Sequence, residues 1–460
     1  PRAGAPAARS TRLVLGALGF FALAPLAHAQ ETTEIASSFE DDDSFDLFVG
    51  VDFSTESRRS LIMREWNRTS GTNPDDPLPV VKDLVFQQTR HVLTPHLALG
   101  LYKGVQFSLA LPVTISDTRT LEFDQRGGNC VFVGPNVNCI DRHNSTTLMD
   151  GFLPDGNAGI LGYDANDPTT NFAPDSRLVF RGVERSGIDQ LHLGLSVALL
   201  DQKKDDTKPT WIVGSELRLS LGKIMKFDRF DPTAQSGVSP GVHEVRVFTR
   251  LYKRTIWAEP FVLFWRQTPF DRRGKSPSDA NCTLIWDVGF GQERPDPQQQ
   301  AGTTFGLNAI PWENRVRAQR IGLEFRGRID GHFEGYGYSE MWEVFALAGE
   351  TSTNGPLVVD LDPVTPGVQA ANFPGTTNIE NYLTFAGSFG VNGQLGDAAR
   401  FSAVFEASHD QRHRITFTDA GIEGPDLDTV VTAGTAEVNP LHQRRIDLVG
   451  RRYISGGSFI

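Results

Sequence analysis

The chain has 460 residues, of which 39% are hydrophobic and 22% charged, and its formal net charge at pH 7 is -12. This acidic balance argues against nucleic acid as a partner, because nucleic-acid-binding domains are usually basic. After the N-terminal region, no stretch approaches the roughly 18 continuous apolar residues of a membrane-spanning helix. A helical membrane span in the rest of the chain is therefore excluded.

The first residues have the pattern of a secretory signal peptide. Arg9 and Arg12 are basic, residues 13–26 are mostly apolar, and Ala29 stands at a position that signal peptidase reads. The apolar run is too short to be a good membrane-spanning helix. We therefore expect residues 1–29 to be a cleaved signal peptide and the remaining chain to be exported.

Two hairpins show the clearest strand pattern. In residues 89–115, apolar side chains such as Leu97 and Leu99 alternate with polar or small ones such as His96, on both sides of a Lys-Gly turn. Residues 190–221 repeat this alternation around a charged turn. A period of two predicts strands with one apolar face and one polar face.

Weaker alternation predicts the remaining strands. They are expected at residues 45–53, 242–252, 256–266, 316–329, 336–349, 379–391, 401–408 and 441–454. Together with the two clear hairpins, they make about twelve strands. Runs of ten to fourteen residues suit tilted strands that cross about 25 Å of hydrocarbon.

Short and long connections alternate along this pattern. The long ones are expected at residues 54–82, 116–186, 222–241, 267–315, 350–378 and 410–440. This regularity predicts an all-β fold: a closed antiparallel up-and-down transmembrane β-barrel with short periplasmic turns and long extracellular loops. We expect a short acidic periplasmic segment at residues 30–44 and the barrel domain at residues 45–460.

The pattern resembles Gram-negative outer-membrane β-barrels of the porin or transporter kind. Residues 99–113 are similar to hairpins of outer-membrane proteins associated with phenol-degradation pathways. The resemblance implies location in the cell outer membrane, contact with outer-membrane lipid and insertion by the barrel-assembly machinery. Only about fifteen residues separate Gln30 from the first predicted strand, too few for the N-terminal plug of fatty-acid transporters or TonB-dependent receptors.

The less apolar strand faces supply the candidate residues of a lumen, where acids and arginines are equally numerous. The lumen-lining candidates are Arg90, His96, His192, Glu216, Arg218, Glu244, Arg246, Arg250, Glu259, Arg320, Glu324, Arg326, Glu343 and Glu406. Because Arg pairs readily with carboxylates, this lining predicts either a polar pore wall or a salt-bridged core. Residues 261–265 and 341–347 are apolar on both faces, which fits a patch for a hydrophobic solute or packing against an inward-folded loop.

The cysteines and the missing motifs limit the chemistry. Cys130 and Cys139 are expected to form a local disulfide in a long loop, and Cys282 is expected to be a spare thiol. We expect no metal site and no cofactor, because the sequence has no zinc-ligand set, phosphate-binding loop or His-Glu-x-x-His motif.

The predicted function is an outer-membrane channel or transporter for passive uptake of small solutes, hydrophobic ones included. The first alternative is a closed-barrel surface scaffold or adhesion protein that acts through its extracellular loops. The second is a lipid-modifying enzyme, but the His-x-Ser signature that outer-membrane phospholipase A would require is absent. We therefore expect no enzymatic activity.

Overall fold

The computed structural model describes residues 12–15, 35–38, 46–65, 80–125, 178–225, 237–272, 297–344, 358–360, 369–370, 377–396, 399–417, 431–432 and 453–459. Within these ranges the fold is all-β, and helical structure is limited to short turns such as the 3-10 helix η1 (Arg315–Arg317). None of the described residues form a helix that is long and apolar enough to cross a membrane.

The strands have the following bounds in chain order: β1 (Arg12–Leu15), β2 (Asp46–Glu65), β3 (Val80–Tyr102), β4 (Val105–Ala110), β5 (Val113–Phe123), β6 (Leu178–Arg181), β7 (Arg185–Ile188), β8 (Gln190–Leu200), β9 (Thr210–Ser220), β10 (Val242–Tyr252), β11 (Ala258–Arg272), β12 (Gln300–Asn314), β13 (Gln319–His332), β14 (Gly335–Gly337), β15 (Val358–Asp360), β16 (Gln369–Ala370), β17 (Thr377–Ile379), β18 (Tyr382–Leu395), β19 (Ala399–Asp410), β20 (His413–Phe417), β21 (Val431–Thr432) and β22 (Tyr453–Phe459). Most strands of the main sheet are longer than the five or six residues typical of soluble sheets.

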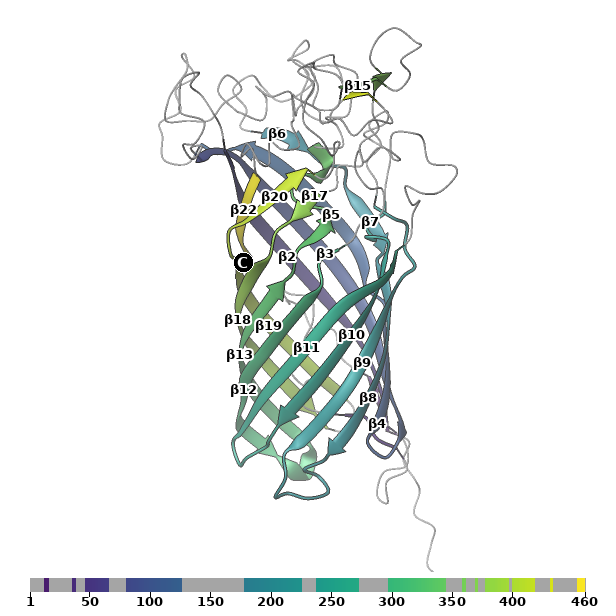
Figure 1. Cartoon of the computed structure of the whole chain (residues 1–460). Coiled ribbons are helices and arrows are strands. Elements are labelled where there is room, and N and C mark those ends of the chain that lie inside the picture. Colours follow the sequence, from purple (N-terminus) through teal and green to yellow (C-terminus); the bar gives the residue numbers. More distant parts are fainter. Residues whose placement is uncertain are drawn as a thin grey trace, which may run out of the picture.

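The long strands form one antiparallel ladder. β2 pairs with β3, β3 with β4 and β5, β4 with β8, and β5 with β7. From β8 the order continues through β9, β10, β11, β12, β13, β18 and β19. β22 pairs with β2 and, over two residues, with β19. The strands are inclined to a common axis and wrap around it (Figure 1), which gives the sheet an inner and an outer face.

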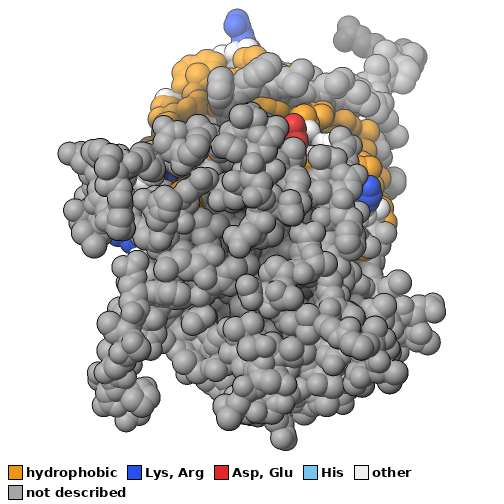
Figure 2. All heavy atoms as spheres, turned by 90° about the horizontal axis from the view of Figure 1, so that it is seen from above, with side chains coloured by type: hydrophobic (Ala, Val, Ile, Leu, Met, Phe, Trp, Pro, Cys, Tyr) orange, Lys and Arg blue, Asp and Glu red, His pale blue; other side chains and the backbone are white. Residues whose placement is uncertain are grey.

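The two faces have opposite chemistry. Large apolar side chains on the outer face are exposed, for example Leu195 at 47% and Phe325 at 51%, whereas Glu324 on the inner face is only 1% exposed. Figure 2 shows hydrophobic side chains along the outer edge where the described atoms are visible. A soluble sheet would bury its apolar face, so this sheet presents the reverse polarity.

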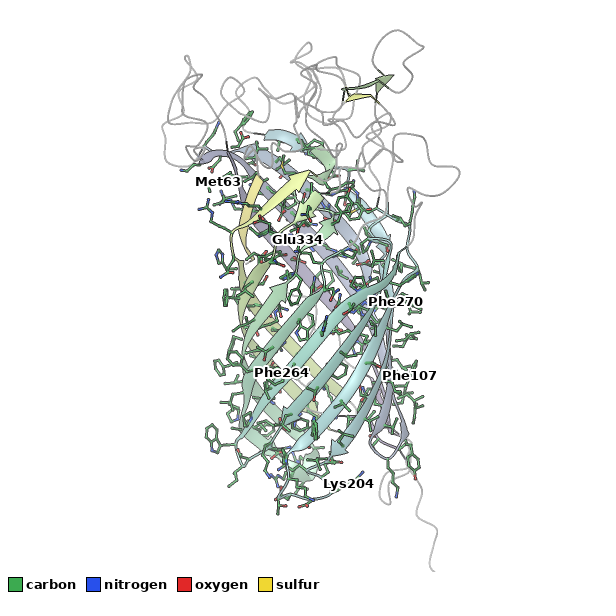
Figure 3. The ribbon with its side chains drawn as sticks, viewed as in Figure 1. Met63, Phe107, Lys204, Phe264, Phe270 and Glu334 are labelled. Atoms are coloured by element: carbon green, nitrogen blue, oxygen red, sulfur yellow. The ribbon has the colours of Figure 1, made fainter. Side chains whose placement is uncertain are left out.

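Short turns collect at one end of the strands, which we call the turn end. They join β3 to β4, β8 to β9, β10 to β11, β12 to β13 and β18 to β19. Gly104 lies in the first of these turns with a φ of 70°, a conformation that glycine adopts without strain. The opposite end, the loop end, carries the longer connections; Lys204 lies at the turn end, and Met63 and Glu334 toward the loop end (Figure 3).

Two inward-facing aromatic rings lie close to cross-strand glycines. Trp265 pairs with Gly302, and a Cβ on that glycine would lie 2.9 Å from the indole Cε2. Phe261 pairs with Gly306 in the same way, at 2.7 Å from its ring. Because glycine has no side chain, Gly302 and Gly306 leave room for these rings to pack against the inner wall.

Most predicted strands lie at observed strands, and residues 242–252 coincide with β10. Two predictions about strands are wrong. β12 lies inside the predicted long connection 267–315, where small residues such as Gly302 and Gly306 hide the alternation. The predicted strand at residues 336–349 is not formed over its described residues 336–344: β14 ends at Gly337, and the neighbouring Met341 and Trp342 are both buried, which a strand in one wall would not allow.

These two errors cancel in the count. If β4 with β5 and β7 with β8 are each taken as one strand, the described ladder has twelve positions, as expected. The connection between β13 and β14 contains Glu334 and lies toward the loop end (Figure 3). Among the described residues the last strand is β22, which overlaps the predicted strand at residues 453–454; residues 441–452 lie outside the described ranges. β1 lies within the residues predicted to be signal peptide and pairs in parallel with β2.

Candidate channel interior

The middle of the inner face carries ion pairs. Arg218 donates to Glu216 at 2.6 Å, and Arg326 donates to Glu324 through Nε at 2.8 Å. In both pairs the two residues are two positions apart on one strand, so they share a face. Because these groups are mostly buried, the pairing offsets part of the cost of removing charges from water.

One pair crosses an intervening strand. Arg328 on β13 donates to Glu406 on β19 at 2.8 Å, although β18 lies between them. The inner face of β18 carries Ala386 and Ser388 at this level, and these small side chains leave room for the guanidinium. Arg328 also lies 3.0 Å from Asp330.

The other candidates take polar partners on neighbouring strands. Arg90 lies 3.0 Å from Asp189 and donates to Thr114, and His96 lies 3.0 Å from Asp52. The remaining contacts are His192 with Glu216 at 3.8 Å, Glu244 with Gln190 at 3.2 Å, and Glu259 with Asn308 at 3.2 Å. Arg320 is also buried. The structure thus places these residues on the inner face, while their lining of a water-filled lumen stays a prediction.

Two arginines on β10 contact aromatic faces. The guanidinium of Arg246 lies 4.4 Å from the ring centroid of Trp265, and that of Arg250 lies 5.5 Å from the ring centroid of Phe248. Stacking of this kind is attractive because the face of an aromatic ring is electron-rich. Phe261 and Trp265 both point inward, so the apolar side of residues 261–265 forms part of the inner wall.

The N-terminal residues 35–38 enter the interior at the turn end. Ile35 packs with Ile212, Tyr252 and Phe261, which come from β9, β10 and β11. The segment also reaches β3 and β4, where Ser38 donates to the carbonyl of Gly100 at 2.6 Å and Gln106 accepts from the backbone of residue 36 at 2.6 Å. The sequence predicted a segment too short for an N-terminal plug, and residues 35–38 are a short strip of chain that lies against the inner face.

A second segment fills the loop end. Residues 338–344, which we call the inner segment, follow β14 and contact several strands. Glu343 lies 2.5 Å from Arg185 on β7, and Glu340 pairs with Arg58 on β2. Trp342 is buried beneath two guanidiniums, Arg185 at 5.1 Å and Arg119 at 5.9 Å from its ring centroid. The predicted lumen residue Glu343 is thus on a folded-in turn, not on a strand.

The sequence did not predict that either residues 35–38 or the inner segment would occupy the interior. The N-terminal segment has no strand alternation, and only its apolar Ile35 within a polar stretch indicates an anchor. The inner segment was predicted as part of a strand from weak alternation over residues 336–349, although residues 341–347 are apolar on both faces. The predicted disulfide between Cys130 and Cys139 lies outside the described residues. Within the described ranges, no group of three His, Cys, Asp or Glu side chains could hold a metal ion.

Comparison with known proteins finds structural likeness only. No family model matches the chain, and no curated protein matches it. An outer-membrane channel from Pseudomonas putida F1 has 7% sequence identity and a TM-score of 0.31, over 88% of this chain and 93% of that chain. A bacterial polysaccharide outer-membrane secretin has 6% identity and a TM-score of 0.18, over 88% of this chain and 97% of that chain. Likeness at this level carries no argument about function.

Proposed function

We propose that this protein is an outer-membrane channel in which the sheet closes as a twelve-stranded transmembrane β-barrel and small solutes pass through its interior. The observation that carries the proposal is the reversed polarity of the sheet, with exposed Phe and Leu outside and charged groups inside. Only lipid makes an apolar outer face of this extent favourable. The proposal involves no catalytic step.

The strands themselves suit a membrane. β8, β9 and β10 each have 11 residues, enough for tilted strands to cross about 25 Å of hydrocarbon. Closure through β22 would pair the edges of β2 and β19, which matters because unpaired backbone groups are costly in lipid. The predicted disulfide, which requires an oxidising compartment, and the predicted signal peptide agree with this location.

The interior suggests a narrow path with a constriction at each end. The ion-paired middle lies between residues 35–38 at the turn end and the inner segment at the loop end. Charged and amide groups along this path can replace the hydration of a small polar solute. We propose that passage depends on the N-terminal segment, because its contacts are fewer and mostly uncharged.

Single-channel conductance of the refolded mature protein in a planar bilayer tests the proposal. Wild-type protein should give small, fluctuating currents, and a variant lacking residues 35–38 should give larger and steadier ones. The matched control is a deletion of four residues from the exposed turn that joins β8 and β9. Each variant is first shown to be folded and inserted by its resistance to protease in vesicles.

The alternative is a closed-barrel surface scaffold or adhesion protein. The observation that favours it is the dense inner packing, in which Asn308 and Asn392 are buried and hydrogen-bonded to each other at 3.1 Å. Such a barrel would give no conductance with or without residues 35–38. That result, from protein shown to be inserted, would replace the channel by the scaffold.

A further inference from the structure

We propose that Arg246, backed by Trp265, is an anion-binding point in the interior that takes the carboxylate of small organic acids. This inference rests on the proposed channel function and names a solute class for it. Its basis is a difference between four short motifs on the inner face, together with the contacts of the Arg246 guanidinium.

A Glu-x-Arg motif occurs on four of the inner strand faces. In two of these motifs the arginine pairs with its own glutamate: Arg218 donates to Glu216, and Arg326 donates to Glu324. In a third motif, on β2, Arg58 pairs with Glu340 of the inner segment. In the fourth motif, Glu244 accepts from Gln190 at 3.2 Å, so Arg246 is left without a carboxylate partner, unlike the arginines of the other three motifs.

The other carboxylates near Arg246 are also occupied. The charged groups that interact with it electrostatically include two acids, Glu216 and Asp330. Glu216 accepts from Arg218, and Asp330 lies 3.0 Å from Arg328. Among the described residues, Arg246 makes no ion pair and no hydrogen bond, and its Nε is buried without an acceptor.

The contact with Trp265 gives the guanidinium a packed support. The guanidinium carbon of Arg246 lies 4.4 Å from the ring centroid of Trp265, and that ring lies close to Gly302. The N–H donors of Arg246 make no hydrogen bond to a described residue and so are available to a ligand. A planar fork of donors matches a carboxylate, which accepts two parallel hydrogen bonds.

Binding and conductance are measured separately, so that the proposed anion site and the proposed channel function can each be rejected on its own. The probe is propionate, and its neutral control is propionamide, which has the same shape. Binding to refolded full mature protein in detergent is followed by calorimetry, and block of the current by each compound is followed in bilayers. The variants are Arg246→Gln, Trp265→Phe and, as a matched loss of charge on the exposed outer face, Arg59→Gln.

We expect propionate, and not propionamide, to bind wild type and Arg59→Gln alike, and Arg246→Gln to bind at least about tenfold more weakly. Trp265→Phe should weaken binding less, since it keeps the donors. Equal propionate binding by wild type and Arg246→Gln would overturn the inference, even if the protein conducts. Equal binding of propionamide would also overturn it. Binding that needs Arg246 in a protein without conductance would support the site and reject the channel.

Discussion

The two ends of the interior are filled by different kinds of contact. At the turn end, residues 35–38 are held by an apolar anchor, Ile35, and by hydrogen bonds such as that from Ser38 to the carbonyl of Gly100. At the loop end, the inner segment is held by ion pairs, including Glu343 with Arg185, and by guanidiniums against Trp342.

The contacts at the turn end can therefore be released more easily than those at the loop end. Neutral hydrogen bonds and one apolar side chain contribute a few kcal/mol, about as much as a conformational equilibrium can reverse. A buried ion pair, in contrast, cannot be opened without leaving charges that are poorly solvated. We therefore expect the loop end to stay closed around its segment and the turn end to fluctuate.

The largest effect should come from breaking the buried pair at the loop end. Arg185→Leu leaves the carboxylate of Glu343 buried without its partner and should cost about 3–5 kcal/mol of unfolding free energy. Urea unfolding of the protein in lipid vesicles measures this cost. The double variant Arg185→Leu with Glu343→Leu should recover much of the loss. A single variant as stable as wild type would mean that the inner segment is not held by this pair.

A second pair of substitutions tests whether the strands that surround both ends of the interior span the membrane. Leu195 is on the outer face near the middle of β8, so Leu195→Arg should cost about 2–4 kcal/mol of insertion free energy. His192→Leu, on the inner face of the same strand, should leave insertion intact. The fraction of folded protein recovered in vesicles measures both. Equal losses would show that the faces are assigned wrongly.

At the turn end, the anchor is the decisive residue. Ile35→Ala removes most of the side chain that packs on Tyr252 and Phe261 and should weaken docking of the segment by about 2 kcal/mol. The open state should then be about thirtyfold more populated, since 1.4 kcal/mol corresponds to a factor of ten. The open time in single-channel records reports this change. Unchanged gating would place the constriction elsewhere.

The smallest effect concerns a single hydrogen bond at the same end. Ser38→Ala removes the donor to the carbonyl of Gly100 and should weaken docking by about 1 kcal/mol. Noise analysis of the current resolves a shift of this size when wild type and variant are recorded in the same salt. If Ser38→Ala exceeded Ile35→Ala in effect, hydrogen bonds and not apolar packing would hold the segment.

The sequence predicted the strands of the sheet better than the segments that fill its interior. β10 was predicted with its observed bounds because Val245, Val247 and Leu251 alternate with Glu244, Arg246 and Arg250, although Phe248 and Thr249 interrupt the pattern. β12 was missed because Gly302 and Gly306 stand on its inner face, where they leave room for the aromatic rings of the neighbouring strand. Alternation reports only on the strand that carries it, so cross-strand fitting of this kind leaves no local signal.

The candidate site shows the same limit. The inner position of Arg246 followed from its alternation, but its partner did not, because Glu244 has the spacing of a partner and turns to Gln190. The choice depends on β8, more than fifty residues away in the chain. The N-terminal segment was missed for a related reason: its position depends on the space above Gly100, where a Cβ would meet the backbone of Ser37 at 2.6 Å.

The pair between Arg328 and Glu406 has a consequence for the fidelity of strand assembly. It joins β13 to β19 across β18, so its geometry depends on two pairing registers at once. A slip of two residues in either register keeps every side chain on its correct face but moves the two groups apart by about 7 Å. The inner and outer polarity of the strands would be unchanged by such a slip. The ion pair would be lost, so it favours the correct alignment of all three strands.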